Sequence, residues 1–160
     1  MKTKKLIVIL SVFYISLSVA FSQEKYEQFC NQKFNYCVSY PSSLLEAKPA
    51  LVGIEGRDFK AKKGEAKISF EAKKAEDVVE PSQGFKSVYT SEIYSKKITY
   101  EVVKADWFVV SGYTESENIF YTKGILKKGV VYFVRIEYPK SEKKTWDSQC
   151  GKIVNSLVIK

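Results

Sequence analysis

The 160-residue sequence contains no histidine, only two arginines and no glycine-rich phosphate-binding loop. Histidine is the commonest general base at neutral pH and the commonest zinc ligand. Its absence excludes His-dependent catalytic triads, HExxH metallopeptidases and zinc deaminases. Apart from Arg57 and Arg135, the positive charge is carried by lysine. Because planar recognition of phosphate favours arginine, the sequence does not indicate a nucleic-acid partner.

The first 22 residues have the pattern of a cleaved export signal. A basic start, Met1–Lys5, precedes an uncharged apolar run, Leu6–Ala20, and small residues stand at Ala20 and Ser22. This predicts cleavage before Gln23. A membrane anchor is the alternative, but a spanning helix needs roughly 20 apolar residues and this run is shorter. No cysteine stands at the cleavage site, so we expect a periplasmic or extracellular protein without a stable membrane anchor.

Residues 23–160 are expected to form one domain, because their number falls within the usual size of a single hydrophobic core. Removal of Lys2, Lys4 and Lys5 from the 26 basic side chains leaves 23 against 18 acidic ones, a net charge of +5. The densest basic cluster comprises Lys60, Lys62, Lys63 and Lys67, interleaved with Asp58 and Glu65. Such mixed runs are typical of a solvated surface rather than an anion site.

Three cysteines remain after the signal, and an exported chain permits disulfides. Cys30 and Cys37 flank a segment with the composition of a hairpin turn, and facing hairpin positions satisfy disulfide geometry. A Cys37–Cys150 bridge would close a longer loop and stabilise more, but proximity along the chain favours Cys30–Cys37. Cys150 lies among apolar residues, as expected of a buried free thiol.

Alternation of apolar residues predicts strands, and a change of period predicts helices. The predicted strands are 26–30, 36–40, 57–61, 65–73, 97–104, 107–113, 118–127 and 130–138, and the predicted helices are 82–95 and 145–156. Short links join the last four strands, which predicts an antiparallel meander. Both faces of 130–138 carry large apolar side chains, so both should be covered. We therefore expect an α+β fold, a central antiparallel sheet flanked by helices on both faces in an α/β/α sandwich.

Four segments resemble the PsbP-like fold, and more narrowly bacterial exported proteins of unknown function with that fold. They are Tyr36-Cys37-Val38-Ser39-Tyr40-Pro41, Val109-Val110-Ser111-Gly112, Ile119-Phe120-Tyr121-Thr122-Lys123 and Ile136-Glu137-Tyr138-Pro139. These are strand-end and packing motifs, and none is catalytic. The resemblance implies a binding or accessory role, because relatives of this fold mostly bind other proteins, but a fold alone does not define a function.

Three polar groupings are candidate sites. Arg135, Glu137 and Glu101 could line a polar pocket, but a cross-strand charge pair explains them more simply. The pair Asp106-Trp107 fits a turn followed by a strand better than a sugar-stacking or acidic site. Glu115 and Glu117 fall on an exposed turn that cannot hold the fixed carboxylate separation of a glycosidase.

The sequence contains many tyrosines in or near strands, and an exposed cluster of them would indicate a partner surface. They include Tyr89, Tyr100, Tyr113, Tyr121, Tyr132 and Tyr138. Half-buried packing in the sheet is the more frequent role of such residues.

We therefore expect an exported, non-enzymatic binding or accessory domain whose partner is a protein or a component of the cell envelope. No catalytic residue, cofactor or metal is expected, and the binding residues are not identified. The alternative is a carrier or sensor of a small apolar ligand held between sheet and helix, which predicts a closed apolar pocket. An enzyme using Cys150 would need a partly exposed thiol with a depressed pKa.

Overall fold

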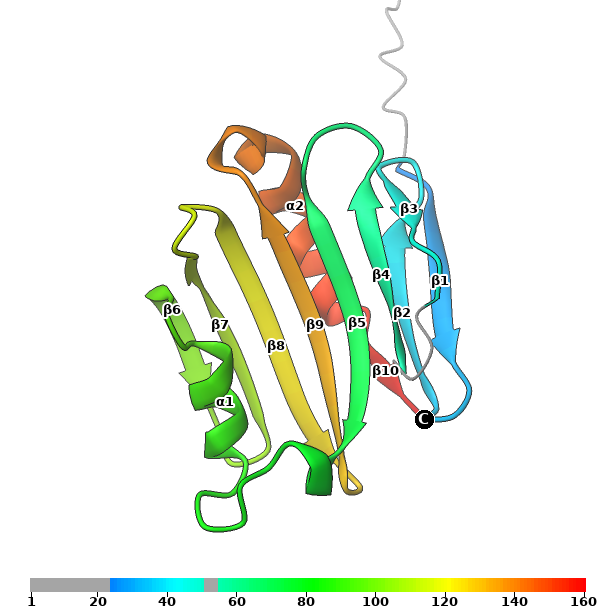
Figure 1. The fold of residues 1–160 in the computed structure, drawn as a ribbon. Helices are drawn as coiled ribbons and strands as arrows, with labels where there is room; N and C mark the ends of the chain where they lie inside the picture. Colours follow the sequence, from blue (N-terminus) through cyan, green and yellow to red (C-terminus); the bar gives the residue numbers. More distant parts are fainter. Residues whose placement is uncertain (1–23, 51–54) are drawn as a thin grey trace, which may run out of the picture.

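The computed structural model describes residues 24–50 and 55–160, so the predicted export signal lies outside the described residues (Figure 1). The strands are β1 (Tyr26–Asn31), β2 (Tyr36–Pro41), β3 (Leu45–Ala47), β4 (Gly56–Ala61), β5 (Lys67–Lys74), β6 (Lys97–Val103), β7 (Trp107–Tyr113), β8 (Ile119–Lys127), β9 (Val130–Tyr138) and β10 (Val158–Ile159). The helices are α1 (Lys86–Glu92) and α2 (Lys143–Asn155), with short 3-10 turns at Ala75–Asp77 and Lys140–Glu142.

The strands form two antiparallel sheets. The larger sheet has seven strands in the order β3-β4-β5-β9-β8-β7-β6, and the smaller has three in the order β1-β2-β10. The predicted four-strand meander is confirmed, because β6, β7, β8 and β9 pair in sequence order. Strand β9 is the middle strand of the larger sheet, and β6 and β3 are its edges.

The central strand β9 is buried on both faces, as its sequence predicted. Tyr132, Val134 and Ile136 on one face are almost fully buried, and so are Val131 and Phe133 on the other. Since alternate residues of a strand point to opposite faces, the chain must cover this sheet on two sides.

One face of the larger sheet is covered by α2 together with the smaller sheet. Trp146, Cys150 and Ile153 of α2 share a single hydrophobic cluster with Tyr36 and Val38 of β2. Strands β4, β5 and β9 complete that cluster. Figure 1 shows α2 behind the larger sheet, with β1, β2 and β10 to one side of it. The two sheets therefore share one core.

Among the described residues, the opposite face is covered by the short helix α1 and the loop before it. Phe85 and Val88 pack with Phe108, Val110 and Phe133 in a second, smaller cluster. Gly84, with a φ of +61°, precedes the helix, and Ser95, with a φ of +60°, follows it. These left-handed residues confine the helix to fewer turns than the apolar spacing of 82–95 predicted.

The predicted α/β/α sandwich is wrong. The chain is mostly β, with two sheets and two short helices, and it does not form a layer of helices on each side of one sheet. The prediction expects one sheet and includes no strand after the last helix. The N-terminal hairpin β1-β2 instead pairs with β10 in a separate sheet, which supplies apolar cover that helices were expected to provide.

No helix within 24–50 or 55–160 combines the length and the apolar character needed to cross a membrane.

Candidate functional site: a groove beside helix α2

A groove runs between α2 and strands β6, β7 and β8. It consists of two adjoining hollows of about 390 and 350 Å³ that share Tyr121, and we call it the α2 groove. The first hollow is lined mainly by apolar and aromatic side chains, which include Tyr100, Val102, Trp107, Tyr121 and Ile125. The basic side chain of Lys123 lies among them. The second continues along the helix past Gly151, Cys150 and Asp147 to Lys143.

The groove exists because α2 is too narrow for the sheet beneath it. Trp146, Cys150 and Ile153 cover β9 and its neighbours, but β6 and β7 extend beyond the helix. Side chains on this face of the outer strands therefore stay in contact with solvent. Tyr100, on the edge strand, is 54% exposed.

Of the residues that the structure describes, Lys123 is the one basic side chain lining the apolar hollow. It stands opposite Val109 of β7 and Val134 of β9, and it is only partly exposed. No ion pair connects it to a carboxylate of residues 24–50 or 55–160. Burial lowers the pKa of its ammonium group, since desolvation disfavours the charged form.

The polar end of the groove contains a chain of hydrogen bonds. The Tyr138 hydroxyl donates to Asp147 at 2.7 Å, and Cys150 Sγ lies 3.8 Å from the same hydroxyl. Burial, and then the Asp147 hydrogen bond, raise the pKa of Tyr138 far above its ordinary value. Burial also raises the pKa of Cys150 to about 11. A thiol that stays protonated at neutral pH is a poor nucleophile, which argues against the enzyme hypothesis for Cys150.

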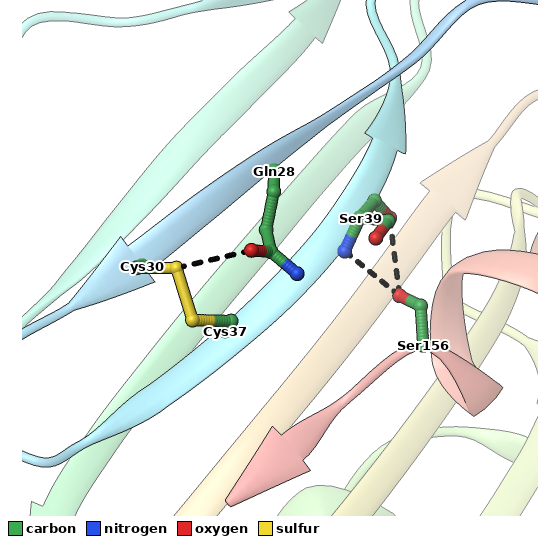
Figure 2. The surroundings of a disulfide bond; sticks show 5 residues. All are labelled: Gln28, Cys30, Cys37, Ser39 and Ser156. Atoms are coloured by element: carbon green, nitrogen blue, oxygen red, sulfur yellow. Dashed lines mark hydrogen bonds between the residues drawn. A yellow bond between two sulfur atoms is a disulfide. The ribbon is translucent and has the colours of Figure 1, made fainter. Parts of the chain in front are cut away.

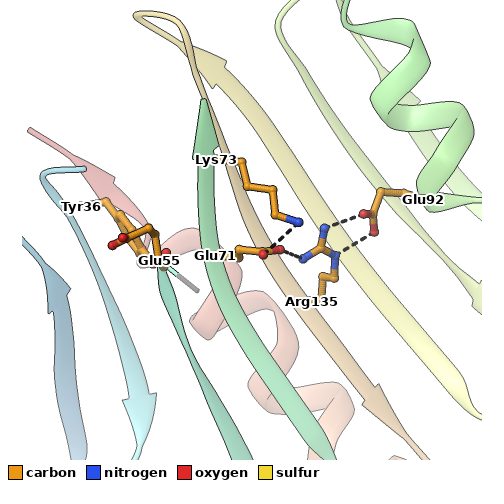
Figure 3. A network of polar contacts seen from close by, with 6 residues as sticks. All are labelled: Tyr36, Glu55, Glu71, Lys73, Glu92 and Arg135. Carbon is orange, nitrogen blue, oxygen red and sulfur yellow. Dashed lines mark hydrogen bonds and ion pairs between the residues drawn. The ribbon is translucent and has the colours of Figure 1, made fainter. Parts of the chain in front are cut away.

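Of the candidate grouping Arg135, Glu137 and Glu101, the first two line one polar hollow and Glu101 is not part of it. The Arg135 guanidinium donates to Glu92 of α1 and Glu71 of β5, and Lys73 pairs with Glu71 at 3.0 Å (Figure 3). The Arg135 guanidinium also lies 4.0 Å from the ring centroid of Phe133. This network fastens α1 to the sheet, so the structural explanation of Arg135 holds although its partners were not those expected.

The other two members of that grouping have separate partners. Glu101 accepts a hydrogen bond from the Tyr89 hydroxyl, which raises the pKa of Tyr89 to about 12. Glu137 accepts one from Asn118 at 2.9 Å. A polar hollow of about 250 Å³ does lie beside Arg135. Its lining mixes lysines with the carboxylates of Asp58 and Glu137, so it presents no single charge to a ligand.

The turn residues occupy the positions that their composition predicted. The Asp106 carbonyl accepts from the Leu126 amide between β6 and β7, and Trp107 begins β7. Glu117 pairs with Lys140 on the surface, and Glu115 is exposed. Within residues 24–50 and 55–160, neither glutamate lines the hollow beside Arg135 or the α2 groove. Trp107 differs from the prediction in one respect, because it also lines the groove.

Cys30 and Cys37 face each other on β1 and β2 and are joined by a disulfide (Figure 2). The Gln28 Oε1 atom lies 3.4 Å from Cys30 Sγ. This is a contact rather than a hydrogen bond, because a bridged sulfur carries no proton. On β2, two residues after Cys37, the Ser39 amide donates to Ser156 Oγ at 2.9 Å. This bond fixes β2 to the end of α2. Cys150 is free and buried.

The tyrosines divide between packing and the groove. Tyr132 is buried in the core, and Tyr138 is buried but also lines the polar end of the groove. Tyr100 and Tyr121 line the apolar hollow. The sequence did not identify Lys123 or Gly151 as groove residues. Lys123 alternates with Tyr121 and Ile125 along β8, and this two-residue period could have indicated that the three side chains share one face of the strand. The position of Gly151 depends on how α2 lies across the sheet, which no local pattern encodes.

Within the described ranges, no three histidine, cysteine, aspartate or glutamate side chains come together as a metal site would require.

No protein-family model matches the sequence, and no curated protein matches it. Structural comparison shows that this chain has a PsbP-like fold. The chain is similar in structure to cyanobacterial PsbP (CyanoP) from Synechocystis sp. PCC 6803, with a TM-score of 0.57 over 88% of this chain and 96% of that chain. Sequence identity is 9%, so the similarity defines the fold and not the activity.

Proposed function

We propose that this protein is an exported, non-enzymatic binding module that receives an extended segment of a partner protein in the α2 groove. The observation that carries this proposal is the set of aromatic and apolar side chains left uncovered beside α2. Tyr100, Trp107 and Tyr121 lie together there on three adjacent strands. Tyrosine and tryptophan are enriched at the centres of protein interfaces, where they bury a large area at little cost in entropy.

The shape of the groove supports an extended protein segment as its occupant. Its floor follows β8 from Ile119 to Ile125, a length of roughly 20 Å at the rise of a strand. The two hollows adjoin and are open to solvent along their length. The alternative of a small apolar ligand held between sheet and helix predicts an enclosed pocket, which this groove does not provide.

Two observations support export. The Cys30–Cys37 disulfide is of a kind that persists in oxidising compartments. Residues 1–22 have the sequence of a cleaved signal. A binding role also agrees with the expectation drawn from the PsbP resemblance.

Site-specific photo-crosslinking in the cells that produce the protein tests this proposal. A photoreactive phenylalanine analogue replaces Tyr100 in the groove or, as a matched control, Tyr94. Tyr94 follows α1 and is an 82% exposed tyrosine outside the groove. We expect a discrete protein adduct from position 100 that is absent from position 94 and is lost when Trp107→Ala is added. Mass spectrometry then identifies the captured protein.

The captured protein is next purified and titrated against this one. Because Trp146 is buried in the core and Trp107 lines the groove, acrylamide quenching reports mainly on Trp107. Binding should shield Trp107 from the quencher. Equal adducts from positions 100 and 94, or no adduct from either, would contradict the proposal. A reproducible small-molecule mass on the natively purified protein would favour the carrier alternative.

A further inference from the structure

Gly151 occupies an unusual position in α2. It is the ninth residue of a helix that runs from Lys143 to Asn155, so it lies away from both ends. A glycine inside a helix costs roughly 0.5–1 kcal/mol relative to alanine. Its backbone is helical and does not require glycine. Something other than local conformation must explain it.

Packing within the chain does not explain Gly151 either. In the part of the chain that the structure describes, no atom other than those of its two chain neighbours and the backbone of α2 lies within 4 Å of the position that its Cβ would take. Gly56, Gly112 and Gly124 are different, since a Cβ at each would lie 2.4 Å or less from a neighbouring atom. Gly151 instead borders the α2 groove. A glycine facing open space is suited to a site where another backbone approaches closely.

Lys123 is a second, independent observation in the same groove. Its side chain alternates with Tyr121 and Ile125 along β8, partly buried and without an acidic partner in residues 24–50 and 55–160. Removing a charge from water without a partner is unfavourable. A carboxylate from an occupant of the groove would supply the missing partner, and the occupant would shield the pair from solvent.

We infer that the partner segment is acidic, that one of its carboxylates pairs with Lys123, and that its main chain passes against Gly151. This inference rests on the proposed function, because it specifies the chemistry of the segment bound in the α2 groove. It selects an extended segment that combines apolar side chains with at least one aspartate or glutamate.

Selection from a displayed library of random ten-residue peptides tests the inference, and it does not require the natural partner to be identified first. The target is the purified, disulfide-bonded protein. We expect the enriched peptides to combine apolar residues with aspartate or glutamate. On Lys123→Glu, selection should instead enrich lysine and arginine. Lys86→Glu makes the same charge change on exposed α1 and should leave the acidic preference intact.

Two substitutions on α2 test the role of Gly151. Gly151→Leu places a side chain in the groove without a clash inside the chain, so its thermal unfolding midpoint should not fall. It should weaken binding of a selected acidic peptide at least about tenfold, measured by fluorescence titration. Ser148→Leu adds the same side chain at an exposed position outside the groove and should leave affinity unchanged.

The outcomes separate this inference from the proposed function. If Trp107→Ala abolishes binding but Lys123→Glu keeps the acidic preference, the groove binds peptides and the carboxylate pairing is wrong. Unchanged affinity in Gly151→Leu overturns the backbone contact. If Trp107→Ala binds the selected peptides as well as the unmodified protein does, the groove itself is not the docking site. Failure to enrich any peptide counts against both.

Discussion

The guanidinium of Arg135 holds the carboxylate of Glu92 through two hydrogen bonds, 2.9 Å from Nε and 2.5 Å from Nη2. Glu92 is the last residue of α1, where the helix dipole disfavours a negative charge. Arg135 lies on the central strand β9 and compensates that charge. A third bond, of 2.8 Å to Glu71, extends the contact to β5. The network therefore joins the short helix to the middle of the sheet (Figure 3).

Arg135→Met is expected to lower the free energy of unfolding by about 2 kcal/mol. The substitution leaves Glu92 without a cation and Glu71 with only Lys73, and an uncompensated charge is costly when water is restricted. The figure lies below that for a fully buried pair because all three side chains retain some exposure. Urea unfolding measures the change. Lys140→Met, which breaks an exposed pair with Glu117 and removes the ammonium group from over the Tyr113 ring, is the control and should move the midpoint little.

Acid should weaken the fold partly through Glu71. Burial acts to raise the pKa of this carboxyl, but hydrogen bonds from Arg135 and Lys73 outweigh it, and the net pKa is lowered. A folded-state pKa below the unfolded value of about 4.3 adds stability above that pH. This contribution is lost as the pH falls further. Urea midpoints at pH 5.5 and 3.5 should therefore differ less in Glu71→Gln than in the unmodified protein, and equal differences would contradict the assignment.

Two glycine-to-alanine substitutions should have opposite effects on stability. A Cβ on Gly124 would lie 2.4 Å from the ring of Phe108, which is fully buried. Gly124→Ala should therefore cost about 1–3 kcal/mol through overpacking. Gly151→Ala meets no atom and should add about 0.5–1 kcal/mol by favouring the helix. Thermal unfolding compares them, and a loss of stability in Gly151→Ala would mean that the fold itself requires the glycine.

The sequence predicted the meander well, because period and turn chemistry are local. Both bounds of β7 and of β9 were predicted correctly, and a two-residue turn between Lys127 and Val130 permits only antiparallel pairing. Strands β3 and β10 were not predicted. They have three and two residues, too few to show alternation, and they form only because a neighbouring strand offers an edge.

The candidate site was harder to predict than the fold. The tyrosines were identified as a candidate surface, but the sequence could not separate Tyr100 in the groove from Tyr132 in the core. That distinction depends on strand order, which places Tyr132 on the central strand against Tyr36 of β2 and Tyr100 on the edge strand β6. The partners of Arg135 also come from segments 43 and 64 residues away along the chain. Contacts of this range have no local pattern.

The cysteines provide a prediction about the chemical state of the protein. The purified mature protein should contain one disulfide, Cys30–Cys37, and one free thiol, Cys150. Cys150 is 5% exposed, and burial raises its pKa to about 11, so both access and ionisation oppose its reaction. A thiol reagent at pH 8 should therefore label the native protein slowly and the unfolded protein once per chain.

Cys30→Ala/Cys37→Ala separates the disulfide from the thiol. Loss of the cross-link that closes this short loop is expected to lower the free energy of unfolding by about 2.5 kcal/mol in the chain-entropy model. The double variant should still fold, because the shared core of β2, β5, β9 and α2 does not depend on the bridge.

Cys150→Ala removes the free thiol and should keep the disulfide. A peptide map that links Cys37 to Cys150 would overturn the pairing. Rapid labelling of native protein would show that α2 moves away from the sheet far enough to expose Cys150.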